Sequence, residues 1–113
     1  MEVSISLLGM FSRPKKSIPA AVIKFNRYSL VFNCSKKIKA GDLIYINLKA
    51  GLHSLREVRG RVEECEPCGR HFQTRVHFVL ERPDKQPYRE AISILKAIEQ
   101  AVPEAMLSPL HMQ

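Results

Sequence analysis

The residues with the clearest potential for chemistry are the two thiols and the imidazole of Cys65-Glu66-Pro67-Cys68-Gly69-Arg70-His71. This spacing could bind zinc, but a structural zinc site needs four ligands and the segment supplies at most three. A fourth would have to come from Cys34, His53 or His77, which are distant in the sequence. A redox role is typical of a cysteine pair at the start of a helix, which the sequence does not indicate here. We therefore interpret the segment as a turn that carries two thiols, and we expect no metal and no cofactor.

Basic side chains dominate the charge of the chain, whose 18 Lys and Arg against 11 Asp and Glu give a net charge of +7. One group falls in two predicted loops and consists of Arg13, Lys15, Lys16, Lys36, Lys37 and Lys39. Alternate loops between antiparallel strands lie at the same end of a barrel, so we expect these side chains together, with Arg70 beside them. Such an end could contact phosphates or an acidic protein, although a solvated loop end is the simpler interpretation.

A second basic group consists of Arg59, Arg61 and Arg75, accompanied by His77. We expect these side chains on the outer faces of two adjacent strands, where neighbouring arginines could bind a carboxylate or phosphate through paired hydrogen bonds. An ordinary solvated sheet face is the alternative.

The composition bounds the class of protein. At 113 residues, 45% hydrophobic and 26% charged, the chain suits one soluble globular domain. No apolar run approaches the length that spans a bilayer. Three cysteines without a secretion signal favour a reduced, cytoplasmic protein. No serine, histidine and acid residues have the setting of a nucleophile or of paired carboxylates, so we do not expect an enzyme.

A two-residue alternation of apolar side chains predicts six short strands. The predicted ranges are 3–11, 20–25, 28–35, 43–48, 57–64 and 72–78. The third and fourth, within Lys24–Leu48, are expected to form a hairpin, and a looser connection is expected between Leu48 and Glu57. Short strands separated by turn residues are typical of a small antiparallel barrel or sandwich.

The pattern changes to a helical period after Pro83, with Asp84 as a candidate cap and Pro87 in the first turn. Apolar residues then recur every three or four positions, at Tyr88, Ala91, Ile92, Leu95, Ile98 and Ala101. This stripe predicts one amphipathic helix that covers an opening of the barrel. We expect residues 1–102 to form one domain and residues 103–113 a flexible tail.

The order of these elements resembles a PilZ domain, a six-stranded antiparallel β-barrel often followed by a helix. The resemblance covers Val3 to about Gln100 and depends on common order and spacing. Its matching segments are Lys24–Phe32, at the position of the family's D-x-S-x-x-G motif, and Ala40–Leu48, Val58–Val62 and His71–Phe78, at the positions of later strands.

The resemblance implies a ligand site that is altered in this chain. Family members that bind cyclic di-GMP use an R-x-x-x-R arm ahead of the first strand together with the D-x-S-x-x-G turn. This sequence begins at the first strand without such an arm, and Lys24, Asn26 and Ser29 replace the acid, the serine and the glycine. The arginines supply the paired and stacking contacts, so we expect weak or absent binding of cyclic di-GMP. The expected role is a protein-interaction adaptor in bacterial signalling, in motility, pilus or surface behaviour.

Two alternatives remain open. The domain could be a cyclic di-GMP receptor with a divergent site made of Lys24, Asn26, Arg27 and Ser29. It could instead bind nucleic acid through the basic loop end, although aromatic residues for base stacking are few and Trp is absent.

Overall fold

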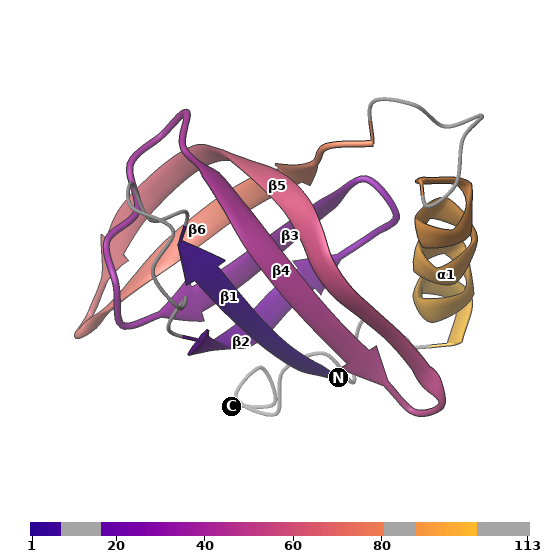
Figure 1. Cartoon of the computed structure of the whole chain (residues 1–113). Coiled ribbons are helices and arrows are strands. Elements are labelled where there is room, and N and C mark those ends of the chain that lie inside the picture. The colour runs from indigo at the N-terminus through magenta and orange to yellow at the C-terminus, as the bar shows by residue number, and fades with distance from the viewer. Residues whose placement is uncertain (8–16, 81–87, 102–113) are drawn as a thin grey trace.

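The chain folds as a closed antiparallel β-barrel with one helix, in a computed structural model that describes residues 1–7, 17–80 and 88–101 (Figure 1). The strands and the helix are Glu2–Leu7 (β1), Ser17–Phe25 (β2), Ser29–Cys34 (β3), Leu43–Ala50 (β4), His53–Cys68 (β5), His71–Phe78 (β6) and Tyr88–Ala101 (α1). Around the barrel the strands follow the order β1-β2-β3-β6-β5-β4, with β4 closing back on β1. The predicted fold class is therefore confirmed.

The barrel consists of two three-stranded meanders, β1–β3 and β4–β6, that join at both edges. One seam pairs β1 with β4, for example Ile5 with Ile46. The other pairs β3 with β6, for example Phe32 with Thr74. Because both seams are hydrogen-bonded, the described barrel has no open edge strand that could pair with another chain.

The predicted hairpin of Lys24–Leu48 is wrong, because β3 pairs with β2 and β6, whereas β4 pairs with β1 and β5. The connection after β3 passes along β5 instead of reversing on itself. The N–H of Gly41 donates to the carbonyl of Val62 at 2.7 Å, and the N–H of Val62 donates to the carbonyl of Asp42 at 2.8 Å. Alternation identified both strands correctly, but it contains no information on which strand is the partner.

The looser connection expected between Leu48 and Glu57 is also wrong. The β4 strand reaches Ala50, and β5 begins at His53 after a turn in which Gly51 has a φ of +59°. A register shift between β4 and β5 interrupts the alternation that would have revealed the longer strand. At that shift Glu57 has a φ of +56°, and its N–H donates to Asn47 Oδ1 at 2.8 Å. Such a bulge adds one residue to one strand and locally breaks the two-residue period.

The other strand boundaries differ less from the predicted ones. The β2 strand begins at Ser17, three residues before the predicted start, and the turn after β5 is only Gly69-Arg70, so the Cys65–Cys68 segment belongs to a strand. Four expectations concern residues outside the described ranges: the end of the first strand at Phe11, the cap at Asp84, the proline of the first helical turn and the tail at 103–113.

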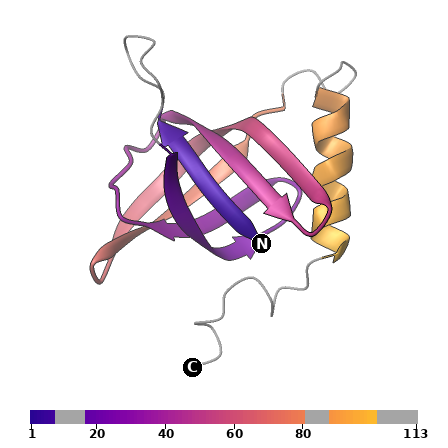
Figure 2. The same ribbon diagram turned by 60° about the horizontal axis from the view of Figure 1, so that its bottom comes forward.

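The core is built by the alternating apolar faces that the sequence predicts. Fully buried side chains from every part of the barrel meet inside it, including Ile5, Leu30, Phe32, Ile44, Ile46, Val62 and Val76. The helix α1 stands at one end of the barrel (Figures 1 and 2). Its Leu95 and Ile98 have no exposed surface and belong to the same core, so the helix covers that opening as its stripe predicts. Within the described part of the chain, no helix is long and apolar enough to cross a bilayer.

Gly60 is the inward position of β5 where the core leaves no room for a side chain. A Cβ there would lie 2.7 Å from Ile46 Cδ1 and 3.5 Å from the Val76 Cβ. Ile46 is fully buried, so its terminal methyl can move away only at the expense of other packing.

We expect Gly60→Ala to lower the free energy of unfolding by about 1–3 kcal/mol through overpacking. Ile46→Val removes the clashing methyl and should cost about 0.5–1.5 kcal/mol alone. In urea denaturation the double variant should lose less than the sum of the single effects, by more than the usual additivity error of about 0.5 kcal/mol. Strictly additive losses would show that the methyl is not what excludes a Cβ.

Candidate functional site

The turn between β2 and β3 is held by the side chain of Asn26. Its Oδ1 accepts hydrogen bonds from the N–H of Tyr28 at 2.7 Å, the N–H of Ser29 at 2.8 Å and the Ser29 hydroxyl at 3.3 Å. The Asn26 N–H donates to the carbonyl of Ser29 at 3.0 Å. Asparagine commonly closes turns through its own following backbone in this way. The acceptor atom of Asn26 is therefore committed to the turn itself.

Arg27, in the same turn, is held by Glu99 of the helix. The guanidinium donates to Glu99 Oε1 from Nε at 3.0 Å and from Nη2 at 2.7 Å, and the Arg27 backbone N–H donates to Oε2 at 2.8 Å. Both side chains are roughly three-quarters covered, with 29% and 26% of their surface exposed. The hydrogen bonds from Arg27 lower the pKa of Glu99, and the same contact raises the pKa of Arg27. This contact ties α1 to the β2–β3 turn.

These contacts involve most of the residues predicted to bind a ligand at this turn. The structure brings Asn26, Arg27 and Ser29 together in one turn, but it directs their principal polar groups at protein atoms. Lys24 lies exposed on β2, opposite Val31 of β3. Glu99 was missed by the sequence reasoning, because the two residues are 72 positions apart and a glutamate on the polar side of a helix has no distinguishing signal.

A second missed feature is a pocket beside the turn, which we call the Tyr28 pocket. It has a volume of about 660 Å³ and is lined by Arg27, Tyr28, His77, Phe78, Leu80, Ile92 and Lys96. It therefore lies where the β2–β3 turn, the end of β6 and the helix meet. Tyr28 exposes 68% of its surface, an unusual extent for a large aromatic residue.

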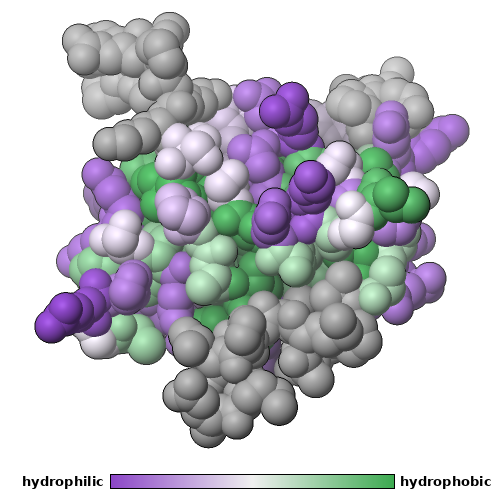
Figure 3. Space-filling view, turned by 90° about the horizontal axis from the view of Figure 1, so that it is seen from below, coloured by the Kyte–Doolittle hydropathy of each residue, from purple (hydrophilic) through white to green (hydrophobic). Residues whose placement is uncertain are grey.

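The first basic group lies in part at the opposite end of the barrel. Lys36, Lys37 and Lys39 are exposed in the connection after β3, around a buried Ile38. Cys34 pairs with Phe72, so the end of β3 lies beside the start of β6. Arg70, in the β5–β6 turn just before β6, therefore lies at this end too. Hydrophilic side chains project there at the left of Figure 3. The other three members, Arg13, Lys15 and Lys16, lie outside the described residues.

The second basic group lies on the outer faces of β5 and β6, as expected, but acids accompany it. Arg75 forms an ion pair with Glu64 at 3.3 Å, and His77 Nε2 lies 3.3 Å from Glu63. Arg59 Nη2 donates to the Tyr88 hydroxyl at 3.1 Å, which links β5 to the helix. Arg61 is exposed on β5 directly opposite His77. This face therefore alternates in sign and does not present a continuous basic surface.

The cysteines do not form one cluster. Cys65 and Cys68 lie three positions apart on β5, so their side chains point to opposite faces of the strand. The Thr74 hydroxyl donates to Cys65 Sγ at 3.4 Å, whereas Cys68 is exposed. Cys34 is buried and donates to the carbonyl of Lys36 at 3.2 Å, and burial raises the pKa of its thiol. Across residues 1–7, 17–80 and 88–101, no three His, Cys, Asp or Glu residues group so as to hold a metal ion.

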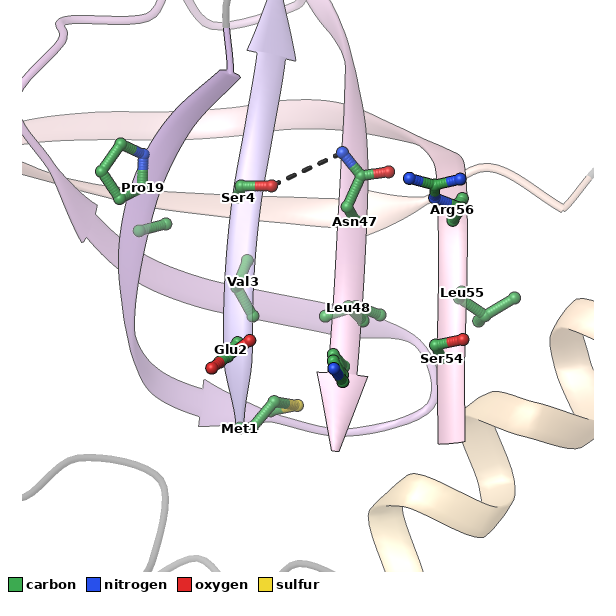
Figure 4. Close-up of a pocket in the computed structure, with 12 residues that line it drawn as sticks. Met1, Glu2, Val3, Ser4, Pro19, Asn47, Leu48, Ser54, Leu55 and Arg56 are labelled. Carbon is green, nitrogen blue, oxygen red and sulfur yellow. Dashed lines mark hydrogen bonds between the residues drawn. The ribbon is translucent and has the colours of Figure 1, made fainter. Parts of the chain in front are cut away.

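A larger but shallow groove of about 720 Å³ runs over the outer surface of β1, β2, β4 and β5 (Figure 4). Ser4 and Asn47 meet in it through a 3.5 Å hydrogen bond, with Arg56 beyond Asn47 and Glu2 toward the chain start. Its charged residues are Glu2 of β1, Lys49 directly opposite it on β4, and Arg56 of β5. The groove brings together no set of groups that would act on or fix a ligand.

No protein-family model matches the chain, and no curated protein matches it. The fold and the geometry of the turn therefore carry the functional argument.

The Arg27–Glu99 contact predicts a pH-dependent contribution of the helix to stability. A carboxyl whose pKa is lowered on folding stabilises the native state above its unfolded pKa, and that stabilisation is lost as the pH falls through the folded value. We expect Glu99→Gln to lower the free energy of unfolding at neutral pH. The difference from the unsubstituted chain should shrink steadily below about pH 4.5, the region where an ordinary glutamate titrates.

Urea denaturation of both proteins at several pH values between neutral and acid conditions measures this difference. Glu66→Gln, at an exposed position of β5, is the control and should not reproduce the pH dependence. A difference that stays constant into acid would mean that the charge of Glu99 does not contribute.

Proposed function

We propose that this chain is a PilZ-like, non-catalytic binding module that acts through protein–protein interaction and does not bind cyclic di-GMP tightly by itself. The closed six-stranded antiparallel barrel followed by a helix agrees with the architecture that the resemblance implies. A barrel of this kind supports many functions, so the state of the β2–β3 turn carries the proposal.

The proposal depends on one observation: the guanidinium of Arg27 is already hydrogen-bonded to the carboxylate of Glu99. A dianionic nucleotide at this turn would need that guanidinium, because Arg27 is the only arginine among the residues of the divergent set. Taking it would break three hydrogen bonds and leave the Glu99 carboxylate uncompensated beside the phosphates. Asn26 compensates only in part: its carbonyl oxygen already receives the N–H groups of Tyr28 and Ser29, and its neutral Nδ2 amide does not replace the charged, paired donors of an arginine.

Two observations support a protein as the partner. The net charge of +7 favours acidic surfaces, and electrostatic complementarity accelerates the encounter of protein partners. An exposed tyrosine lies next to an arginine in the Tyr28 pocket, and tyrosine and arginine are both enriched at protein interfaces. We place this module in the bacterial cytoplasm, in signalling that controls motility, pili or surface behaviour.

Isothermal titration calorimetry with cyclic di-GMP tests the proposal. The chain should show no saturable binding in the micromolar range or tighter, because the turn lacks a free arginine fork. Saturable micromolar binding that Arg27→Ala abolishes would contradict the proposal and favour the divergent receptor. Glu99→Gln is the informative companion, since binding gained only in that variant would identify the Arg27–Glu99 contact as the block.

The exposed lysines of the β3–β4 connection favour nucleic acid as a second candidate. Phosphate contacts would release counterions, so an electrophoretic shift of duplex DNA seen at low salt should weaken steeply as salt is raised. Replacing Lys36, Lys37 and Lys39 by alanine should abolish the shift. The same change at Lys24, Lys49 and Lys96 removes equal charge elsewhere and should largely preserve it. Absence of a shift at low salt would eliminate this candidate.

A further inference from the structure

The Tyr28 pocket combines an apolar lining with a basic rim. Phe78, Leu80 and Ile92 supply the apolar part, and Phe78 is itself braced by an edge-to-face contact with Phe25, with ring centroids 6.2 Å apart. Arg27, His77 and Lys96 supply the basic part. A pocket of about 660 Å³ is large enough for one or two amino-acid side chains and falls in the size range of natural binding sites.

The backbone beneath Tyr28 is held in place on both sides. Its N–H donates to Asn26 Oδ1, and its carbonyl accepts a 2.9 Å hydrogen bond from the N–H of Phe78. The residue before it is fixed by Glu99 through backbone and side chain. The turn therefore presents an exposed aromatic ring from a restrained main chain. Such an arrangement lowers the entropy lost on binding, which is the feature that makes interface tyrosines effective anchors.

The charges around the pocket select the kind of ligand. No acidic residue is among its lining residues in the described part of the chain. Glu99 and Glu63 already contact Arg27 and His77 of the lining. Among the described lining residues, a ligand carboxylate would therefore be attracted chiefly by the exposed Lys96.

We propose that the Tyr28 pocket binds an acidic segment of a partner protein, which inserts an apolar side chain against Tyr28 and Ile92 and places a carboxylate near Lys96. This inference rests on the proposed protein-binding function and assigns it a surface. A second copy of this chain is disfavoured by the repulsion between two surfaces of net charge +7. The lysines that favour nucleic acid lie at the opposite end of the barrel, beside the β5–β6 turn.

Selection from a phage-displayed library of random linear peptides, with the full chain as bait, tests this assignment. Enriched peptides should contain an aromatic residue or leucine flanked by Asp or Glu. Synthetic fluorescein-labelled versions should bind in fluorescence anisotropy, and Tyr28→Ala and Lys96→Glu should each weaken binding by at least about tenfold.

Two matched controls lie outside the pocket. Leu52→Ala removes the other exposed large hydrophobic side chain of the described residues, at the β4–β5 turn, and Lys37→Glu reverses a charge at the opposite end of the barrel. Both should leave peptide affinity within about twofold, the range of ordinary surface substitutions. Thermal unfolding of all four variants verifies that each remains folded.

The remaining outcomes overturn the assignment in distinguishable ways. Selected peptides that lack acidic residues, or whose binding is insensitive to Tyr28→Ala, would exclude the Tyr28 pocket. Binding that depends on Lys37 instead would move the interface to the other end and leave the proposed protein-binding function intact. Failure to select any peptide that depends on Tyr28 would also count against the pocket. Tight binding of cyclic di-GMP, by contrast, would contradict the proposed function itself.

Discussion

The rest of the structure depends on the two seams that close the barrel. Pairing of β1 with β4 and of β3 with β6 turns two meanders into one continuous ladder, and only then do their apolar faces enclose a common core. Closure satisfies the backbone hydrogen bonds of every described strand edge, so the barrel surface is left to side-chain chemistry. It also creates two ends of different character, one filled by the helix and the other carrying exposed lysines.

The helix connects the core to the surface that we consider functional. Leu95 and Ile98 fill the barrel opening, and Glu99, the residue after Ile98, fixes Arg27. A single element therefore supplies both apolar burial and, at the edge of the same face, a polar contact. The polar contact withdraws the one arginine of the β2–β3 turn from ligand binding while it steadies the backbone from which Tyr28 projects. The same geometry thus argues against a nucleotide at this turn and in favour of a protein surface beside it.

Sequence reasoning predicted the class of the fold and the orientation of individual strands well. Ile44, Ile46 and Leu48 alternate along β4 and all three are buried inside the barrel, because burial on one face directly constrains residue type along a strand. The sequence reasoning failed where the extent or the partner of a strand depends on the whole fold and not on the local pattern. The bulge at Glu57 hid the first four residues of β5, and the Gly41-Asp42 pair suggested a hairpin although the strands on its two sides belong to different meanders.

Side-chain periodicity over a few neighbouring residues was enough to predict the central part of each strand, the helix, and the apolar faces that build the core. Tertiary structure alone decided the neighbours: β4 beside β1, Arg27 beside Glu99, and Tyr28 beside Ile92 and Lys96. These contacts join residues that are far apart in the chain, and they arise only when the barrel closes and the helix packs over its end. The candidate site consists entirely of such contacts.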